Sequence, residues 1–234
     1  MTIREQEEEL FRQWKQAWKE PSFIEDGVFD EDTWSSQPYK ITFVLKEPNW
    51  PEETRTENIC RSVMEGSNRN QWRTWNNIAR WTKALLDGSP FPGALSRDQR
   101  LEQLRRVSFL NLKKAGGDGS ADMDEIRSYA FQSAGGICRQ LLLYRPDLLV
   151  CCGWDGPGVA DILEKEVLER CGLPVQDREE SEHISWAYVH FPGKERLTPV
   201  VDFRHPSQRG SGYPMWEEWY EWMLEIRALL IPHS

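Results

Sequence analysis

Four short apolar runs, separated by longer segments with helical spacing, constrain the fold of this chain more than any other feature. The runs span Ile41–Leu45, residues 107–112, Leu148–Cys152 and residues 199–203. Segments of helical length precede, separate or follow them, at about residues 4–19, 69–86, 122–144, 158–171 and 215–230. Strands that alternate with helices in this way predict an α/β fold with three layers, α/β/α, around a mostly parallel four-stranded central sheet.

The amino-terminal part of the chain differs in character from the rest. Residues 4–19 predict an acidic amphipathic helix, and a polar, turn-rich stretch continues to Pro38. The full length of 234 residues is that of one ordinary domain. We therefore predict an N-terminal acidic helix and polar flap over residues 1–38, and a single α/β domain over residues 39–234. Weak alternation over residues 184–191 adds an edge strand to that domain.

Charge and cysteine content restrict the partners and cofactors of the protein. Lys and Arg total 29 against 38 Asp and Glu, a formal net charge of −9, so binding to nucleic acid would need a local basic face. The five cysteines include no C-x-x-C pair, which argues against a disulfide framework and a cysteine-ligated zinc or iron–sulfur centre. The acidic N-terminus is unlike a signal peptide, and no run reaches the ~18 apolar residues of a membrane span. We expect a cytoplasmic monomer that needs no metal, cofactor or membrane.

Polar residues follow the predicted strands, where the ligand crevice of an open α/β sheet lies. Glu47 comes just after the first strand, Asn111 lies at the end of the second and His205 comes just after the fourth. The third strand runs into Gly153-Trp154-Asp155. A carboxylate, a carboxamide and an imidazole are therefore expected at one edge of the sheet. Such a set can break a bond without a metal ion.

The motifs around these residues occur in the order seen in a known family. They are Glu47-Pro48, Phe109-Leu-Asn111-Leu, the run from Leu148 to Gly153-Trp154, and His205-Pro206-Ser207. With them, residues from about 40 to 230 resemble the uracil-DNA glycosylase superfamily. The chain departs from the family's pattern in three places. Lys46, or Leu45 in a shifted alignment, replaces a Gly, Glu47 replaces an Asp, and Asn49 replaces the Tyr that blocks C5 substituents in uracil-specific members.

The resemblance implies a role for each of the three central residues. Glu47 would stabilise an oxocarbenium-like sugar and orient or deprotonate the attacking water. His205 would donate a hydrogen bond to O2 of the departing base. Asn111 would read the Watson–Crick edge of a flipped base, with uracil and cytosine each suiting one orientation of its amide. The structural alternatives are a solvated turn carboxylate for Glu47, a capping or core histidine for His205, and a strand-end turn residue for Asn111.

The same resemblance places DNA contacts around the mouth of the site. Arg209 and Gly210, with Gln208, would sit on a loop that enters the minor groove. The full set of expected DNA-binding residues is Lys113, Lys114, Arg204, Ser207, Gln208, Arg209 and Gly210. The acidic excess lies mostly elsewhere, in residues 5–32, 52–57 and 176–182. Segregated charge of this kind would reconcile the net charge of −9 with weak, salt-sensitive binding to DNA.

The resemblance thus implies a DNA glycosylase, and a monofunctional one, because no Lys occupies the nucleophile position. Asn49 opens the C5 side of the pocket unless the neighbouring Trp50 fills that space, and the residues leave these two readings open. An open pocket favours a hydroxymethylated or glucosylated cytosine of phage DNA, excised in antiviral defence, with uracil in DNA repair as the other substrate. The alternative is a non-catalytic protein of the same fold that binds nucleic acid or a nucleotide. A small-molecule α/β hydrolase is disfavoured because the chain has neither a G-x-S-x-G elbow nor a Walker-type loop.

Overall fold

The computed structural model describes residues 1–18, 22–49, 56–66, 72–117, 121–153, 158–208 and 213–231. Within them the chain forms a main sheet of seven strands in the order β2-β5-β3-β6-β9-β8-β7. In that order the strands are Gly27–Val28, Ser108–Asn111, Ile41–Leu45, Leu148–Cys152, Thr198–Phe203, Ser185–Val189 and Val175–Glu180. A separate parallel pair joins β1 (Phe23–Glu25) to β4 (Thr56–Asn58).

The four strands expected from the sequence form the centre of this sheet, and the prediction of an α/β fold is confirmed. They lie side by side as β5-β3-β6-β9, and each pairs with its neighbour in parallel. The expectation of a mostly parallel sheet of four strands is wrong. β2, β8 and β7 extend the sheet through antiparallel pairings, so that three of the six pairings in the described sheet are antiparallel. The segment expected as an edge strand, β8, has β7 outside it.

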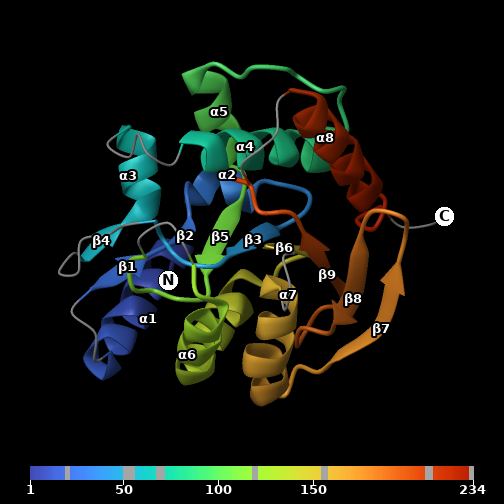
Figure 1. The fold of residues 1–234 in the computed structure, drawn as a ribbon. Helices are drawn as coiled ribbons and strands as arrows, with labels where there is room; N and C mark the ends of the chain where they lie inside the picture. The colour runs from blue at the N-terminus through green and yellow to red at the C-terminus, as the bar shows by residue number, and fades with distance from the viewer. Residues whose placement is uncertain are drawn as a thin grey trace.

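Helices cover both faces of the sheet, giving three layers (Figure 1). Above the sheet in that view lie α4 (Trp72–Asp87), α5 (Arg97–Leu104) and α8 (Tyr213–Arg227), with α3 (Ile59–Glu65) to one side. Below it lie α1 (Ile3–Ala17), α6 (Met123–Tyr144) and α7 (Val159–Ile162). A π-helical segment, η2 (Leu163–Leu168), and a 3₁₀ turn, η3 (Glu169–Cys171), continue α7, and α2 (Glu31–Ser35) precedes β3.

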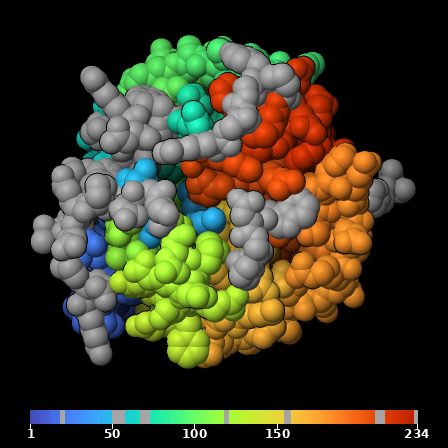
Figure 2. Space-filling view, in the orientation of Figure 1, coloured from blue at the N-terminus to red at the C-terminus, as the bar shows by residue number. Residues whose placement is uncertain are grey.

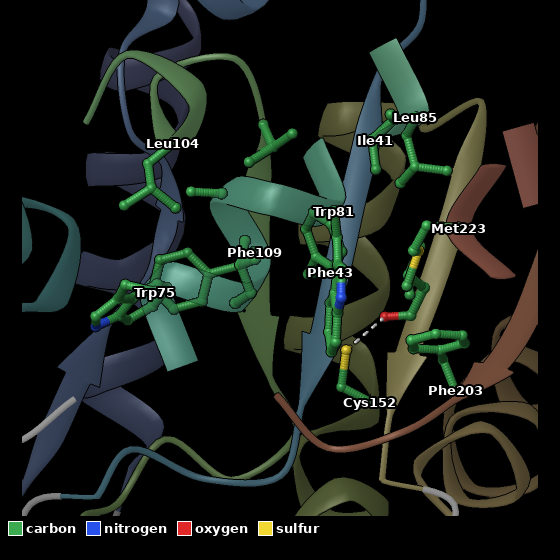
Figure 3. Packing of buried hydrophobic residues seen from close by; sticks show 14 of the residues in the cluster. Ile41, Phe43, Trp75, Trp81, Leu85, Leu104, Phe109, Cys152, Phe203 and Met223 are labelled. Atoms are coloured by element: carbon green, nitrogen blue, oxygen red, sulfur yellow. Dashed lines mark hydrogen bonds between the residues drawn. The ribbon is translucent and has the colours of Figure 1, made fainter. Parts of the chain in front are cut away.

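Alternation along the buried strands divides the core into two halves. Phe43 of β3 points to the α4 side, where Trp81 packs against it and against Phe203 of β9, as Figure 3 shows. Val44, the next residue of β3, belongs to the cluster on the α6 side. Side chains that alternate across a strand supply both layers, which is why these strands are mostly apolar on both faces.

The N-terminal residues pack into the same core. Phe11 and Trp14 of α1 lie among the buried side chains of the α6 side, and Trp14 fits over Gly136 of α6. A Cβ at Gly136 would lie 2.5 Å from the Trp14 ring, so only glycine permits this approach. β2 adds to the main sheet beside β5. In the part of the chain that is described, no helix is long and apolar enough to cross a membrane.

Candidate active site

The loops that follow β3 and β5 are joined to one another beyond the end of the sheet. The backbone N–H of Leu112 donates to the carbonyl of Leu45, and that of Lys113 donates to the carbonyl of Lys46, both at 3.0 Å. Further out, the N–H of Gly117 donates to the carbonyl of Pro48 at 2.9 Å. These bonds extend the parallel register past the strands and hold the residues around Glu47 in a defined position.

Two adjoining pockets lie at this edge and share Glu47, Asn49, His205 and Ser207. The first is also lined by Leu45, Pro48, Ile59, Thr74, Trp75 and Asn111, and the second by Lys46 and Ala121. The cavity volume is about 80 Å³ in the first pocket and about 180 Å³ in the second. In Figure 2 the light-blue segment after β3 reaches the surface between the yellow-green start of α6 and the orange segment after β9.

Glu47 is a buried carboxylate held by one lysine. Its side chain is 7% exposed, and Lys113 Nζ lies 2.8 Å from its Oε2. The same ammonium group lies 3.0 Å from Oε2 of Glu125, at the start of α6. Burial by itself would lower the pKa of Lys113, but its hydrogen bonds to Glu47 and Glu125 outweigh burial and raise that pKa. Gly117 leaves the space that Glu47 fills, since a Cβ there would lie 2.2 Å from the carboxyl carbon.

Asn111 is placed by a buried aspartate. Its backbone N–H and its side-chain Nδ2 both donate to Oδ2 of Asp26, at 2.6 and 3.2 Å. Asp26 lies between β1 and β2 and forms a fully buried ion pair with Lys114, whose Nζ is 2.6 Å from each carboxylate oxygen. Burial lowers the pKa of Lys114, and the ion pair with Asp26 opposes that effect.

His205 is held by its own turn and by α4. Its Nδ1 accepts a hydrogen bond from the backbone N–H of Ser207 at 3.2 Å, and Oγ of Ser207 lies 2.9 Å away. A backbone N–H can only donate, so Nδ1 is the acceptor and the neutral ring carries its proton on Nε2. Nδ2 of Asn77, a buried residue of α4, donates to the carbonyl of Pro206 at 2.7 Å and holds the turn against that helix.

The structure places some of the expected base-recognition and DNA-binding residues in the pocket and others in buried ion pairs away from solvent. Asn111, Asn49 and Ser207 line the pocket with Glu47 and His205. The prediction that Lys114 binds DNA is wrong, because its side chain is fully buried and paired with Asp26. Lys113 is likewise only 4% exposed, and it binds Glu47 and Glu125 instead of offering its charge to a phosphate.

The other predicted contacts are placed outside the pocket or not described. Arg204 lies with its guanidinium 5.9 Å from the ring centre of Trp222 on α8. Gln208 is half-buried, and its N–H donates to the carbonyl of His205. The remaining predicted residues, Trp50, Arg209 and Gly210, lie outside the described residues, as do Trp154 and Asp155.

Several residues at the site were not singled out from the sequence. Trp75 forms one wall of the first pocket. It also packs edge-on against Phe109 of the core, as Figure 3 shows, and the two ring centres are 5.0 Å apart. Trp75 is 1% exposed, so it belongs to the core as well as to the wall of the pocket. Lys46, which the sequence marks only as the replacement of a Gly, lines the second pocket, and its Cε lies 2.5 Å from where a Cβ of Gly153 would be. No sequence pattern around Asp26 indicates its role, because its partner Asn111 lies 85 residues away in the chain.

No protein-family model matches this chain, and a search of curated protein sequences finds no match either. What the protein does must therefore be inferred from the geometry of the site. Among the described residues, no group of three or more His, Cys, Asp or Glu side chains is placed to hold a metal ion.

Proposed function

We propose that this protein is a monofunctional DNA glycosylase, which flips an altered pyrimidine out of DNA and hydrolyses its N-glycosidic bond to leave an abasic site. One observation carries the proposal: Glu47, Asn111 and His205, from three strand ends, line one pocket. A buried carboxylate, an amide and an imidazole that carries its proton on Nε2 match the groups that this reaction needs.

The contacts of Glu47 fit the part of the reaction that concerns the sugar. Cleavage of the bond between C1′ and the base leaves positive charge on the sugar, which an adjacent carboxylate stabilises. Lys113 binds Oε2, so Oε1 is the oxygen that would orient the attacking water and take its proton. The water oxygen bonds to C1′, while the electron pair of the broken bond leaves with the base.

His205 fits the part of the reaction that concerns the base. With Nδ1 accepting from Ser207, Nε2–H is the donor that would stabilise negative charge on the base O2. The base anion then takes a proton from solvent, which completes the hydrolysis. Neither step needs a group from outside the protein other than water.

The two pockets support a pyrimidine with a substituent at C5. The smaller pocket, between Asn111 and Trp75, would hold the base, and the larger one beside Asn49 and Ala121 would hold the substituent. The favoured substrate is a hydroxymethylated or glucosylated cytosine of phage DNA, which would make the protein an antiviral enzyme. Uracil is the second candidate, because it needs only the smaller pocket. The DNA contacts would have to come from residues other than Lys113 and Lys114.

The test uses duplexes that contain uracil, 5-hydroxymethylcytosine or its glucosylated form. Abasic sites are counted by alkaline cleavage, and binding is measured in parallel. Glu47→Gln should lower the rate of excision by about 10²- to 10⁴-fold. The matched control is Glu125→Gln, because Glu125 binds the same ammonium group from the side of α6 with a side chain that is 47% exposed. It should change the rate by less than about fivefold. Binding without any abasic site would instead support the non-catalytic alternative.

A further inference from the structure

A buried carboxylate fixes the orientation of the residue that would read the base. Oδ2 of Asp26 accepts hydrogen bonds from the backbone N–H and from Nδ2 of Asn111. The other bonds of Asp26 go to Nζ of Lys114 at 2.6 Å and to Nε2 of Gln140 at 2.8 Å. Asp26 is 1% exposed and Lys114 and Gln140 are fully buried, so this arrangement is closed to water.

The chemistry of these partners determines which end of the Asn111 amide faces Asp26. A carboxylate paired with a lysine accepts hydrogen bonds and cannot donate them, so it must face Nδ2 and not Oδ1. An amide turned by 180° would place Oδ1 against the carboxylate and lose a hydrogen bond to a charged group. That loss would disfavour the turned amide by about 10- to 100-fold.

A fixed amide presents one fixed pattern of hydrogen-bond donor and acceptor to the pyrimidine. Nδ2 carries two protons, of which one goes to Asp26, so Oδ1 and the second N–H form the edge offered to the pocket. Cytosine presents an amino group at C4 beside an acceptor at N3, whereas uracil presents a carbonyl at C4 beside an N–H at N3. In one binding pose, a given order of Oδ1 and Nδ2 pairs with only one of these two patterns.

We propose that Asp26 is a positioning residue that locks the Asn111 amide in one orientation, so that the pocket discriminates between 4-amino and 4-oxo pyrimidines. The inference rests on the proposed glycosylase function and deepens it. Lys114 takes part by keeping the buried carboxylate paired. Without the lock the pocket would not show this selectivity, because the Asn111 amide alone suits either base.

The test compares two substrates that differ only at C4, 5-hydroxymethylcytosine and 5-hydroxymethyluracil. The ratio of their kcat/KM values is the readout, because a general loss of structure lowers both values together. The variant is Asp26→Leu combined with Lys114→Met, since Asp26→Leu alone would leave a buried lysine unpaired and threaten folding. A leucine at position 26 offers no acceptor to Nδ2 of Asn111, so the lock is removed.

We expect the double variant to reduce the ratio by at least about tenfold toward one. The control is Tyr144→Phe, which removes the hydroxyl that contacts Gln140 and Glu7 at the far end of the same network and leaves Asp26 and Asn111 in contact. It should leave the ratio within about twofold of the wild type. A folded double variant with an unchanged ratio would overturn the proposal.

A second readout separates this inference from the proposed function. In side-chain ¹H–¹⁵N spectra of the free protein, one Nδ2 proton of Asn111 should lie downfield because of its charged acceptor, and the double variant should lose that shift. A wild type that shows the shift but releases no base from these duplexes, or from duplexes that contain glucosylated cytosine or uracil, would refute the glycosylase function and leave the lock standing. A wild type without the shift would refute the lock itself.

Discussion

Glu7 of α1 provides a stability prediction that can be worked out from its surroundings. Its carboxyl is almost fully buried, and its Oε1 accepts hydrogen bonds from the hydroxyl of Tyr144 at 2.5 Å and from the backbone N–H of Val28 at 3.0 Å. Burial raises the pKa of Glu7 from 4.5 to about 7, although both hydrogen bonds act to lower it.

The sign of the effect follows from the protons bound in each state. Between pH 4.5 and about 7 the folded protein keeps a proton on Glu7 that the unfolded chain has lost, so this group makes the fold less stable as the pH rises. The two pKa values differ by about 2.5 (about 7 minus 4.5), which corresponds to about 3 kcal/mol once the pH exceeds about 7. Glu7→Gln removes the titration and keeps an oxygen to accept both hydrogen bonds.

Urea unfolding of the wild type and of Glu7→Gln at pH 5 and pH 8 measures this effect. The variant should gain about 2–3 kcal/mol of unfolding free energy relative to the wild type between the two pH values. Glu8→Gln is the control, because Glu8 lies exposed on the same helix, and it should show no such gain. An equal difference between Glu7→Gln and the wild type at both pH values would refute the reasoning.

Two further predictions concern the pocket. Gly117→Ala places a methyl group 2.2 Å from the Glu47 carboxyl carbon and should slow excision about 100-fold. Gly135→Ala is the control, because a Cβ there has no neighbour within 4 Å, and it should leave the rate unchanged. Equal rates of the two variants in single-turnover assays would contradict this packing. Asn49→Tyr should lower excision of a glucosylated cytosine at least about tenfold more than excision of uracil, and equal losses in kcat/KM would show that the C5 substituent does not pass Asn49.

The central strands of the fold can be predicted from the sequence because they are buried on both faces. Ile41–Leu45 and Leu148–Cys152 have apolar or β-branched residues at every position, and their observed bounds equal the predicted ones. β2 has only two residues, too few to show any periodicity. β7 is charged and mostly exposed, with a bulge between Gln176 and Glu179, so no apolar pattern marks it. The antiparallel edges of the sheet were therefore missed.

Some site residues could likewise be predicted from their neighbours in the sequence, whereas the roles of others depend on contacts with distant residues. Glu47, Asn111 and His205 could be grouped because each lies at a strand end, and parallel strands bring their ends to one edge. The two lysines after β5 could not be interpreted correctly. Their acidic partners, Glu47 and Asp26, lie 66 and 88 residues away in the sequence, and a lysine paired in this way looks in sequence like one on the surface.

The loss of these two lysines from the predicted DNA-binding surface also changes what the net charge of −9 implies. Among the described residues near the pocket, Lys46 lines the second space and Arg204 lies beyond it beside Trp222. Few cations therefore face the mouth in the described part of the chain. Selectivity would depend on the fit of the flipped base. Binding to unmodified DNA would be weak and, because few cations contact phosphates, would depend only slightly on salt.

The most direct measurement of the central claim is the detection of the free base by mass spectrometry after incubation with each modified duplex. The proposed hydrolysis predicts that an intact modified cytosine or uracil is released in equal amount to the alkali-labile sites. Glu47→Gln should slow the formation of both products about 10²- to 10⁴-fold, while Glu125→Gln should not. If no free base appears from any of the duplexes, or if Glu47→Gln releases it at the wild-type rate, the assignment of Glu47 and of the glycosylase function is contradicted.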